Sequence, residues 1–295
     1  MYKILEAKEL AANIFSMVVE AKRVAKACQP GQFVIVRTDY EAERIPLTIC
    51  DYDRQKGTVT IVFQIVGAGT MKMANLKAGD MFSDFVGPLG CPSEFISEDL
   101  NELKNKKILF VAGGVGTAPV YPQIKWLHEQ GVDADVIVGA KNKELVILED
   151  EMKAVAGNLY ITTDDGSYGR SGMVTQTITD LVNDGNHYDV CVAIGPMIMM
   201  KFVCKLTKEL GLHTIVSLNP IMVDGTGMCG ACRVSVGGKV KFACVDGPEF
   251  DGHEVNFEEA MQRQQLYKTV EGRAFLKEKE GSTHHGGCGN CGGEK

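Results

Sequence analysis

Hydrophobic and polar residues alternate along much of the first 95 positions of the chain. The clearest runs, at 1–10, 13–21, 31–38 and 57–66, are rich in Val, Ile and Phe and are separated by glycine, proline or charged turns. A period of two places one face of a strand on a core and the other in solvent. Several short strands of this kind predict a small antiparallel β-barrel over residues 1–95.

The pattern changes after about residue 104. Apolar strand-like runs occur at 106–114, 134–140, 158–166 and 188–196, and helical patterns occur at 119–131, 174–182 and 199–210. Strands that alternate with helices form parallel sheets with crossover helices. We therefore expect an α/β doubly wound nucleotide-binding domain over residues 96–222, with four parallel strands.

The remaining segments are too short for cores of their own. Residues 223–250 are rich in glycine and cysteine and form a separate module in this interpretation. In 251–295, Asn256 followed by Glu259 resembles a capping box, which predicts a helix from Phe257 to about 268 and a second helix at 271–279. The Gly- and His-rich end, with Cys288 and Cys291, is expected to be a flexible tail, although it also has the residue types to bind a metal or a partner.

Charge and composition exclude several partners. The chain has 295 residues with 31 basic and 38 acidic side chains, a net charge of −7, which argues against a nucleic-acid surface or an anionic membrane as partner. No stretch approaches the roughly 20 apolar residues of a membrane-spanning helix. The first residues lack a signal-peptide core, so we expect a cytoplasmic protein whose thiols stay reduced.

Ten cysteines in such a chain indicate either buried thiols or metal chemistry. Five are scattered singly and are expected to be small buried hydrophobic residues: Cys28, Cys50, Cys91, Cys191 and Cys204. Cys229, Cys232 and Cys244 lie together in a glycine-rich stretch. Plant-type [2Fe–2S] loops follow C-x4-C-x2-C, and Asp224 occupies the position of the first cysteine. Three thiolates and one carboxylate complete a four-ligand set; a structural zinc site and free thiols are the alternatives.

Two glycine motifs close predicted strands of the second domain. Gly113, Gly114, Val115, Gly116 and Thr117 lie between an apolar strand and a helix. Without side chains the backbone can approach a pyrophosphate, and the helix N-terminus offers N–H groups to it. Gly195-Pro196-Met197 closes the fourth strand, where ligands of open parallel sheets bind. Tight turns without a ligand are the alternative at both places.

Two further motifs lie on the predicted barrel. Arg44, at the start of a strand through Thr48, offers a forked donor to a phosphate. A stretch from Gly67 to Thr70 follows the strand at 58–65. Each motif alone is equally consistent with a surface charge or a turn. Their position on one barrel, ahead of a nucleotide-binding domain, favours a cofactor site.

In this order, the motifs resemble those of the ferredoxin-reductase superfamily. Within it the chain is similar to the electron-transfer subunit of dihydroorotate dehydrogenase. It is more similar to the small subunits of NADH-dependent reduced ferredoxin:NADP oxidoreductases, also called sulfide dehydrogenases. Aspartate at the first ligand position and helices beyond Val255 favour the second group.

The resemblance implies FAD, a [2Fe–2S] cluster and NAD(H). The isoalloxazine would contact Pro46, Leu47 and Thr48 with Arg44 nearby; the ribityl and phosphate part would contact Gln64, Ile65, Gly69 and Thr70; and NAD(H) would contact residues 113–117 and 195–197. The carboxylates Asp164 and Asp165 either face the cofactor or cap a turn.

The implied activity is that of an oxidoreductase subunit, with no acid–base site for a substrate of its own. A flavin between a nicotinamide and a cluster converts hydrides into single electrons. The resemblance implies a heterodimer with a large flavin and [4Fe–4S] subunit resembling the small subunit of glutamate synthase. Ferredoxin would be an indirect partner, in an electron-bifurcating reaction. The alternatives are the dihydroorotate dehydrogenase subunit and a zinc-stabilised nucleotide-binding regulator without turnover.

Overall fold

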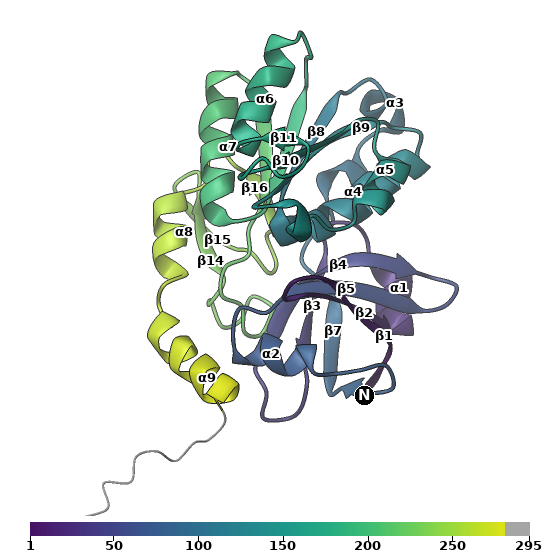
Figure 1. Ribbon diagram of the computed structural model, residues 1–295, viewed down its shortest axis with the longest axis vertical. Helices are drawn as coiled ribbons and strands as arrows, with labels where there is room; N and C mark the ends of the chain where they lie inside the picture. The colour runs from purple at the N-terminus through teal and green to yellow at the C-terminus, as the bar shows by residue number, and fades with distance from the viewer. Residues whose placement is uncertain (281–295) are drawn as a thin grey trace, which may run out of the picture.

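The computed structural model describes residues 1–280, and an antiparallel barrel forms the first part of it (Figure 1). Its sheet has the order β6-β1-β2-β5-β4-β3-β7. The strands are β1 Tyr2–Ala11, β2 Ile14–Glu20, β3 Phe33–Arg37, β4 Ile45–Asp53, β5 Thr58–Gln64, β6 Met81–Phe82 and β7 Asp84–Leu89. Two short helices, α1 Lys22–Ala27 and α2 Ala68–Ala74, interrupt them. The alternating runs of the sequence form this barrel because their apolar face fills its interior: Ile4, Met17, Val36, Ile61 and Phe85 are all buried.

The second part is the expected α/β domain. Its sheet has the order β11-β10-β9-β8-β12-β13-β16. The strands are β8 Ile108–Gly113, β9 Ala134–Ala140, β10 Leu159–Thr163, β11 Arg170–Ser171, β12 Val190–Ile194, β13 His213–Ser217 and β16 Glu249–Asp251. The helices are α3 Leu100–Leu103, α4 Thr117–Glu129, α5 Glu149–Val155, α6 Val174–Asn183 and α7 Met197–Glu209, with 3-10 turns at Glu94–Ser97, Gly114–Gly116 and Lys143–Leu145.

The sheet extends beyond the four parallel strands expected from the sequence. The parallel strand β13 directly follows α7 and pairs with β12, and β16 pairs antiparallel with β13. Because β16 comes from the segment after the cysteines, the cysteine-rich stretch is tied at its end to the edge of the α/β sheet. The pairing of residue 216 with residue 250 spans a long loop, which a local pattern does not reveal.

The cysteine-rich stretch contains one hairpin, β14 Arg233–Val236 with β15 Lys239–Phe242, and leads into helices α8 Phe257–Arg263 and α9 Lys268–Glu280. The Asn256 side chain caps α8 as expected, since its Oδ1 accepts a hydrogen bond of 3.1 Å from the Glu259 N–H. The helix α8 is shorter than predicted and α9 begins earlier. Figure 1 shows these helices passing down the side of the molecule, and Glu278 of α9 forms an ion pair with Lys72 of α2 on the barrel.

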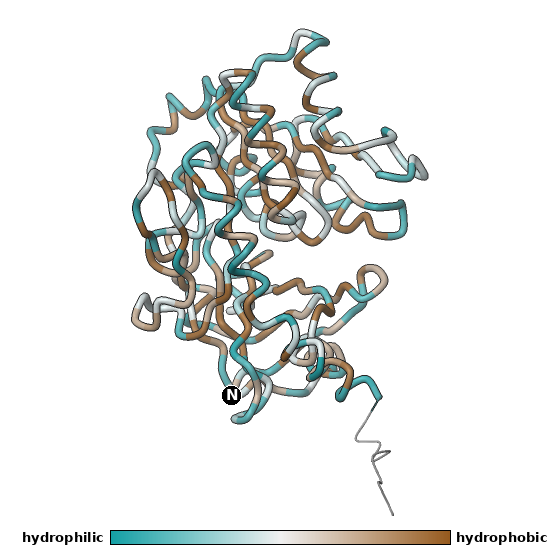
Figure 2. Tube along the Cα trace, turned by 90° about the vertical axis from the view of Figure 1, so that its left-hand side faces the viewer, coloured by the Kyte–Doolittle hydropathy of each residue, from teal (hydrophilic) through white to brown (hydrophobic). Residues whose placement is uncertain are grey.

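A small apolar cluster joins the barrel to the α/β domain. It contains Ile14, Cys50 and Val62 from the barrel and Ala118 and Ile147 from the α/β domain. Beside it, Lys125 Nζ of α4 lies 2.8 Å from Asp51 Oδ1 of β4. In Figure 2 the hydrophobic positions run through the interior of both parts, and polar positions follow the outer turns.

Within residues 1–280, the structure contains no helix with the length and apolar character needed to cross a bilayer.

Candidate functional site: a cleft beside a cysteine loop

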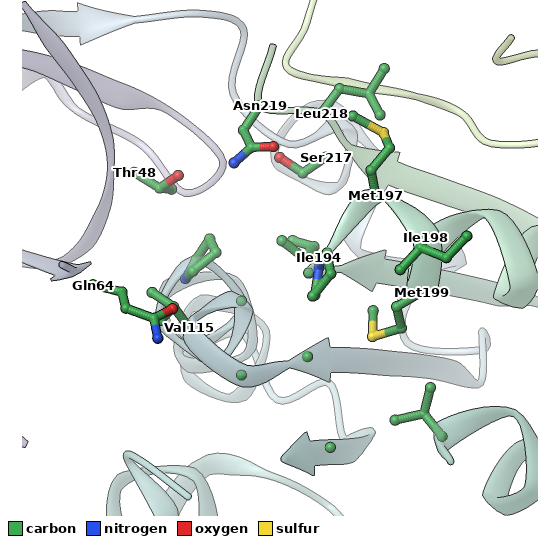
Figure 3. A pocket seen from close by; sticks show the side chains of 18 of the residues that line it. Thr48, Gln64, Val115, Ile194, Met197, Ile198, Met199, Ser217, Leu218 and Asn219 are labelled. Atoms are coloured by element: carbon green, nitrogen blue, oxygen red, sulfur yellow. The ribbon is translucent and has the colours of Figure 1, made fainter. Parts of the chain in front are cut away.

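A cleft of about 1780 Å³ separates the barrel from the α/β domain. Thr48 and Gln64 reach it from the barrel, and Val115, Ile194 and Met199 face them from the α/β domain (Figure 3). On the α/β side the cleft lies at the carboxyl ends of β8 and β12. The chain continues from β8 to β9 on one side, while β12 lies on the other, so this is a topological switch point of the sheet.

The two glycine motifs meet at this edge of the sheet. A Cβ atom at Gly116 would lie 2.2 Å from the carbonyl oxygen of Ile194, and one at Gly195 would lie 3.0 Å from the Cα of Gly113. At Gly113 itself a Cβ would meet the sulfur of Met199. The turns after β8 and β12 therefore touch through their backbones, which explains the absence of side chains at three positions. Backbone groups of both turns therefore line the cleft.

Most of the residues predicted to bind cofactors line this one cleft. These are Pro46, Leu47, Thr48, Gln64, Thr70, Gly113, Gly114, Val115, Gly116, Gly195, Pro196 and Met197. The other five, Arg44, Ile65, Gly67, Gly69 and Thr117, do not line it. Thr117 is buried and its hydroxyl donates to the Gly114 carbonyl at 2.8 Å, so its place is in the turn.

The stretch from Gly67 to Thr70 forms the start of α2. The Thr70 hydroxyl accepts hydrogen bonds from the N–H groups of Val66 (2.9 Å) and Gly67 (3.1 Å) and donates to the Gly67 carbonyl at 3.0 Å. A Cβ at Gly69 would lie 2.8 Å from a Glu43 carboxylate oxygen and 2.9 Å from Ile45 Cδ1. Gly69 is therefore packed against the start of β4. Thr70 thus combines a structural role at the turn with a place at the cleft.

Asp164 and Asp165, which follow β10, differ in their surroundings. Asp165 caps its turn, because its carboxylate accepts from the Ser167 N–H at 2.9 Å and from the Ser167 hydroxyl at 2.6 Å. Its hydrogen bonds to Ser167 lower the pKa of the Asp165 carboxyl. Asp164 lines the cleft together with Lys141 at the end of β9.

The cysteine loop brings two of its three thiols together. Cys232 and Cys244 are buried and their sulfurs are 3.2 Å apart, while Cys229 is exposed. Burial, with the neighbouring Cys232, raises the pKa of the Cys244 thiol to about 12, so a metal would have to displace its proton. Across residues 1–280, no three Cys, His, Asp or Glu side chains converge closely enough to hold a single metal ion.

Asp224 stands at the start of this loop. Its Oδ1 accepts from the Thr226 N–H, and its Oδ2 accepts from the N–H groups of Met228 and Cys229, each at 3.0 Å. Hydrogen bonds from the backbone, that of Thr226 above all, lower the pKa of the Asp224 carboxyl. The carboxylate of this predicted ligand is therefore ionised and held by the backbone of the loop.

The donor set of the loop fits an iron–sulfur cluster. It offers two buried thiols, one exposed thiol and one ionised carboxylate, on a backbone that turns at Gly225, Gly227 and Gly230, all with positive φ. Glycine adopts this left-handed conformation without the strain that a side chain would cause. Cys229, Cys232, Cys244 and Asp224 would hold the cluster, which supplies one-electron chemistry when bound.

The cleft and the cysteine loop share a wall. Phe33 of β3 and Met222, which precedes the loop, both line the cleft. The same two side chains belong to the buried apolar cluster that contains Cys232 and Cys244. Sequence reasoning missed both, because an isolated Phe on a strand and a Met in a loop have no pattern that marks them. Apolar side chains therefore connect the cleft lining directly to the buried thiols.

The scattered cysteines are mostly as expected. Cys28, Cys50, Cys191 and Cys204 are buried, but Cys91 is exposed, so the expectation was wrong there. Cys91 follows the last barrel strand, where its thiol donates to the Val245 carbonyl at 3.2 Å. The predicted tail with Cys288 and Cys291 lies outside the described residues.

Comparison with protein families gives matches for the cysteine loop and for the α/β side of the cleft. Residues 219–256 match the iron–sulfur cluster binding domain of dihydroorotate dehydrogenase B, and residues 110–205 match the oxidoreductase NAD-binding domain. The first match contains all four predicted ligands and favours iron–sulfur over zinc. The second match runs from within β8 into α7 and includes both glycine motifs.

Similar proteins extend this relationship over the whole chain. The chain is 64% identical, over the full length of both proteins, to an uncharacterized Clostridium beijerinckii protein encoded in the adh 3′ region. It is 43% identical to the Thermotoga maritima homologue of the dihydroorotate dehydrogenase B (NAD(+)) electron transfer subunit, covering 91% of this chain and 92% of that one. A solved structure of the NADH-dependent reduced ferredoxin–NADP oxidoreductase is 41% identical, with a TM-score of 0.86, covering 94% of this chain and 98% of the other.

The Thermotoga maritima relative is a homologue of an electron transfer subunit, and the solved structure is that of a ferredoxin–NADP oxidoreductase. The shared domains, the fold and the identity along nearly the whole chain confirm an NAD-linked flavin and iron–sulfur oxidoreductase role. The chain belongs to the family of dihydroorotate dehydrogenase B electron-transfer subunits and their homologues, within the ferredoxin-reductase fold.

Proposed function

We propose that this chain accepts hydride from NADH onto FAD in the cleft and passes single electrons through a [2Fe–2S] cluster to a partner subunit. The partner would be a large flavin and [4Fe–4S] subunit resembling the small subunit of glutamate synthase. The assembly would bifurcate electrons between ferredoxin and the two nicotinamides. The identity along nearly the whole of the NADH-dependent reduced ferredoxin–NADP oxidoreductase chain supports this assembly.

The observation that carries the proposal is the wall shared by the cleft and the cysteine loop. Phe33 and Met222 belong both to the cleft lining and to the apolar cluster around Cys232 and Cys244. A flavin in the cleft and a cluster on the loop would then both contact this apolar wall. An enzyme with such a pair needs only to place the redox groups close together.

Within this proposal the cleft residues have separate tasks. Pro46, Leu47 and Thr48 contact the isoalloxazine, and Gln64 and Thr70 contact the ribityl and phosphate part. The glycine turns at 113–116 and 195–197 bind the nicotinamide nucleotide through backbone N–H groups. Ile65, Gly67, Gly69 and Thr117 remain predicted cofactor contacts of the same segments, although they do not line the cleft. In this proposal the FAD-binding barrel spans residues 1–95 and the NAD-binding domain spans 96–222. The cluster module spans 223–250, and the C-terminal segment spans 251–295.

The test is a purification followed by anaerobic reduction. The full chain, isolated anaerobically, should contain about one FAD and two irons, and NADH should bleach the flavin before a reduced-cluster EPR signal appears. Co-expression with a candidate large subunit should give a complex that reduces NADP⁺ to NADPH with electrons from reduced ferredoxin and NADH. A complex that instead oxidises dihydroorotate would support the alternative partner, and a colourless zinc protein would contradict the whole proposal.

A further inference from the structure

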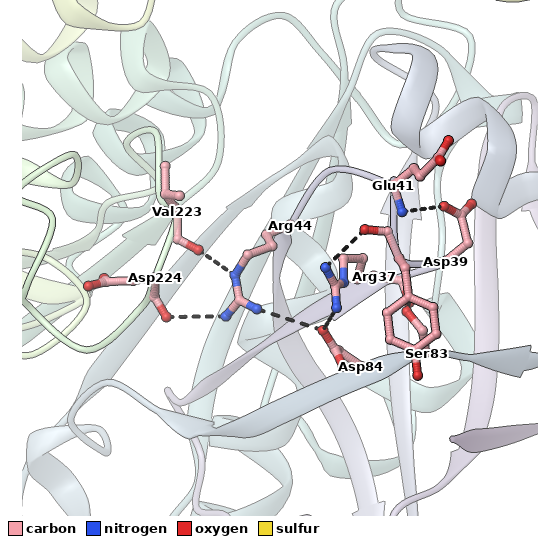
Figure 4. A network of polar contacts seen from close by, with 9 residues as sticks. Arg37, Asp39, Glu41, Arg44, Ser83, Asp84, Val223 and Asp224 are labelled. Atoms are coloured by element: carbon pink, nitrogen blue, oxygen red, sulfur yellow. Dashed lines mark hydrogen bonds and ion pairs between the residues drawn. The ribbon is translucent and has the colours of Figure 1, made fainter.

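Arg44 connects the barrel to the cysteine loop. Its Nε donates to the Val223 carbonyl at 2.7 Å and an Nη donates to the Asp224 carbonyl at 3.3 Å, although these residues are about 180 positions away in the sequence. Figure 4 shows the guanidinium lying between the two loop carbonyls on one side and Asp84 on the other. Arg44 does not line the cleft. Its donors face the loop that carries the predicted cluster ligands.

A second arginine holds this group in place. Arg37 Nη2 lies 2.7 Å from Asp84 Oδ2, and Arg37 also donates to the Tyr40 carbonyl at 3.2 Å. Asp84 Oδ2 in turn lies 3.9 Å from Arg44 Nη1. The side chains of Arg37, Arg44 and Asp84 are each less than one-third exposed. The network therefore orients the Arg44 guanidinium from the barrel side, and of its three side chains Arg44 is the one that hydrogen-bonds the loop.

The loop end that Arg44 contacts is also packed against the barrel. A Cβ at Gly225 would lie 2.6 Å from Ile35 Cδ1 and 2.8 Å from Leu89 Cδ1, so the backbone of the loop touches β3 and β7 directly. The Asp224 carbonyl accepts from Arg44, while the Asp224 carboxylate accepts from N–H groups further along the loop. One residue thus joins the guanidinium to the turn that carries Cys229.

We propose that Arg44 is a positioning residue for the iron–sulfur cluster: it fixes the first turn of the cysteine loop to the flavin domain and thereby sets the position of the cluster relative to the flavin. This inference rests on the proposed function and differs from the phosphate contact that family resemblance implies for Arg44. In the step concerned, the reduced flavin loses one electron and one ferric ion of the cluster becomes ferrous. Loosening the loop would slow this step without changing hydride transfer from NADH.

The test compares Arg44→Met with Arg37→Met in the full chain. Arg37→Met disturbs the same Asp84 but removes no contact to the loop. For Arg44→Met we expect FAD content and NADH bleaching of the flavin to equal those of the wild type, cluster reduction to slow about tenfold or more, and the reduced-cluster EPR signal to broaden. Arg37→Met should leave the EPR signal and the cluster reduction rate close to wild type.

Arg44→Lys provides a second variant that keeps the charge but offers a single donor group. It should show an intermediate rate, and it keeps the test decisive if Arg44→Met does not fold. Loss of FAD from both Arg44 variants with an unchanged EPR signal would overturn the positioning role and support the phosphate contact. Unchanged rate and EPR signal in both would also overturn it. A wild-type chain without iron or flavin would instead refute the proposed function itself.

Discussion

The cleft and the cysteine loop are built in opposite ways. The cleft is bounded by strand ends and helix starts of two domains, and its glycine turns touch through their backbones. Between Asp224 and Cys232 the cysteine loop contains no strand or helix, and its third thiol, Cys244, follows the hairpin of β14 and β15. Its place depends on Arg44, on the packing of Gly225 and on the amide contacts of Asp224.

This difference predicts how substitutions in the cleft and in the cysteine loop affect the protein. A site on regular elements is rigid, so a change to its backbone contacts should affect nucleotide binding and the fold together. A loop held by a few contacts can lose its geometry while the rest of the molecule stays folded. We therefore expect cleft variants and loop variants to separate into two classes, with the second class sparing the flavin.

The largest expected effect is on the loop. Cys232→Ser replaces a buried thiol that lies 3.2 Å from the Cys244 sulfur, and a serine hydroxyl is a poor ligand for iron. We expect iron to be lost almost completely, while FAD content and flavin bleaching by NADH remain. Iron analysis and EPR provide the measurement, with the exposed Cys91→Ser as control. Retention of both irons in Cys232→Ser would contradict the assignment of the cluster to this loop.

The next largest effect is expected for a substitution in the cleft. Gly116→Ala would place a methyl group 2.2 Å from the Ile194 carbonyl oxygen, so the turns after β8 and β12 must separate. We expect NADH to bind roughly tenfold more weakly or worse, a loss of about 1.4 kcal/mol or more. Titration of flavin bleaching with NADH measures this, and Gly272→Ala on α9, where a Cβ meets nothing within 4 Å, is the matched control. Equal affinity in both variants would show that the contact between the turns is not needed.

A third change separates packing from backbone strain in the loop. Gly225 and Gly238 have similar positive φ values, +78° and +71°, but a Cβ at Gly225 would meet Ile35 and Leu89 whereas one at Gly238 meets nothing within 4 Å. Alanine should cost about 1–2 kcal/mol at either position for the left-handed backbone. At Gly225 overpacking should add about 1–3 kcal/mol. Urea denaturation measures the free energies of unfolding, and equal losses would refute tight packing of the loop on the barrel.

The sequence predicts the cleft better than it predicts the loop, and the reason is the range of the contacts. The barrel runs and the glycine turn after Ile108–Gly113 follow from periodicity and from strand–turn–helix order, which are local signals. For the cysteine loop, spacing alone led to the predicted ligands Asp224, Cys229, Cys232 and Cys244. Strands and helices of the α/β domain alternate along the chain as expected, because this alternation is also a local signal.

Contacts between distant segments could not be predicted. Arg44 meets Asp224 some 180 residues away, and β16 joins the α/β sheet after the whole cysteine-rich stretch. Neither pairing leaves a periodic trace in the sequence. The role of Met222 in the shared wall is equally hidden, since a single methionine in a loop fits any gap. Such contacts decide how the two regions sit together, and only the structure reveals them.

The last change tests β16, the strand that joins the cysteine-rich stretch to the α/β sheet. Glu249 on β16 is half-buried; its Oε1 accepts from Gln123 at 2.7 Å, and its Oε2 is buried without a hydrogen-bond partner among the described residues. Burial, and secondarily the nearby Glu94 carboxylate, raises the pKa of Glu249 from 4.5 to about 7, against hydrogen bonds from Ser93 and Gln123. The native state therefore holds this proton more tightly than the unfolded chain. The stability that it contributes is complete below pH 4.5 and is lost as the pH rises to about 7.

Glu249→Gln keeps the shape and removes the charge. Relative to wild type, the variant should gain little at pH 4.5 and up to about 3 kcal/mol at pH 8, because a shift of one pKa unit corresponds to about 1.4 kcal/mol. Urea denaturation between pH 4.5 and 8 measures the difference, with the exposed Glu6→Gln as control. A difference that stays constant across this range would mean that Glu249 is ionised in the folded protein. In that case the strand that ties the cysteine loop to the α/β sheet tolerates a buried charge, and the junction is wetter than its packing indicates.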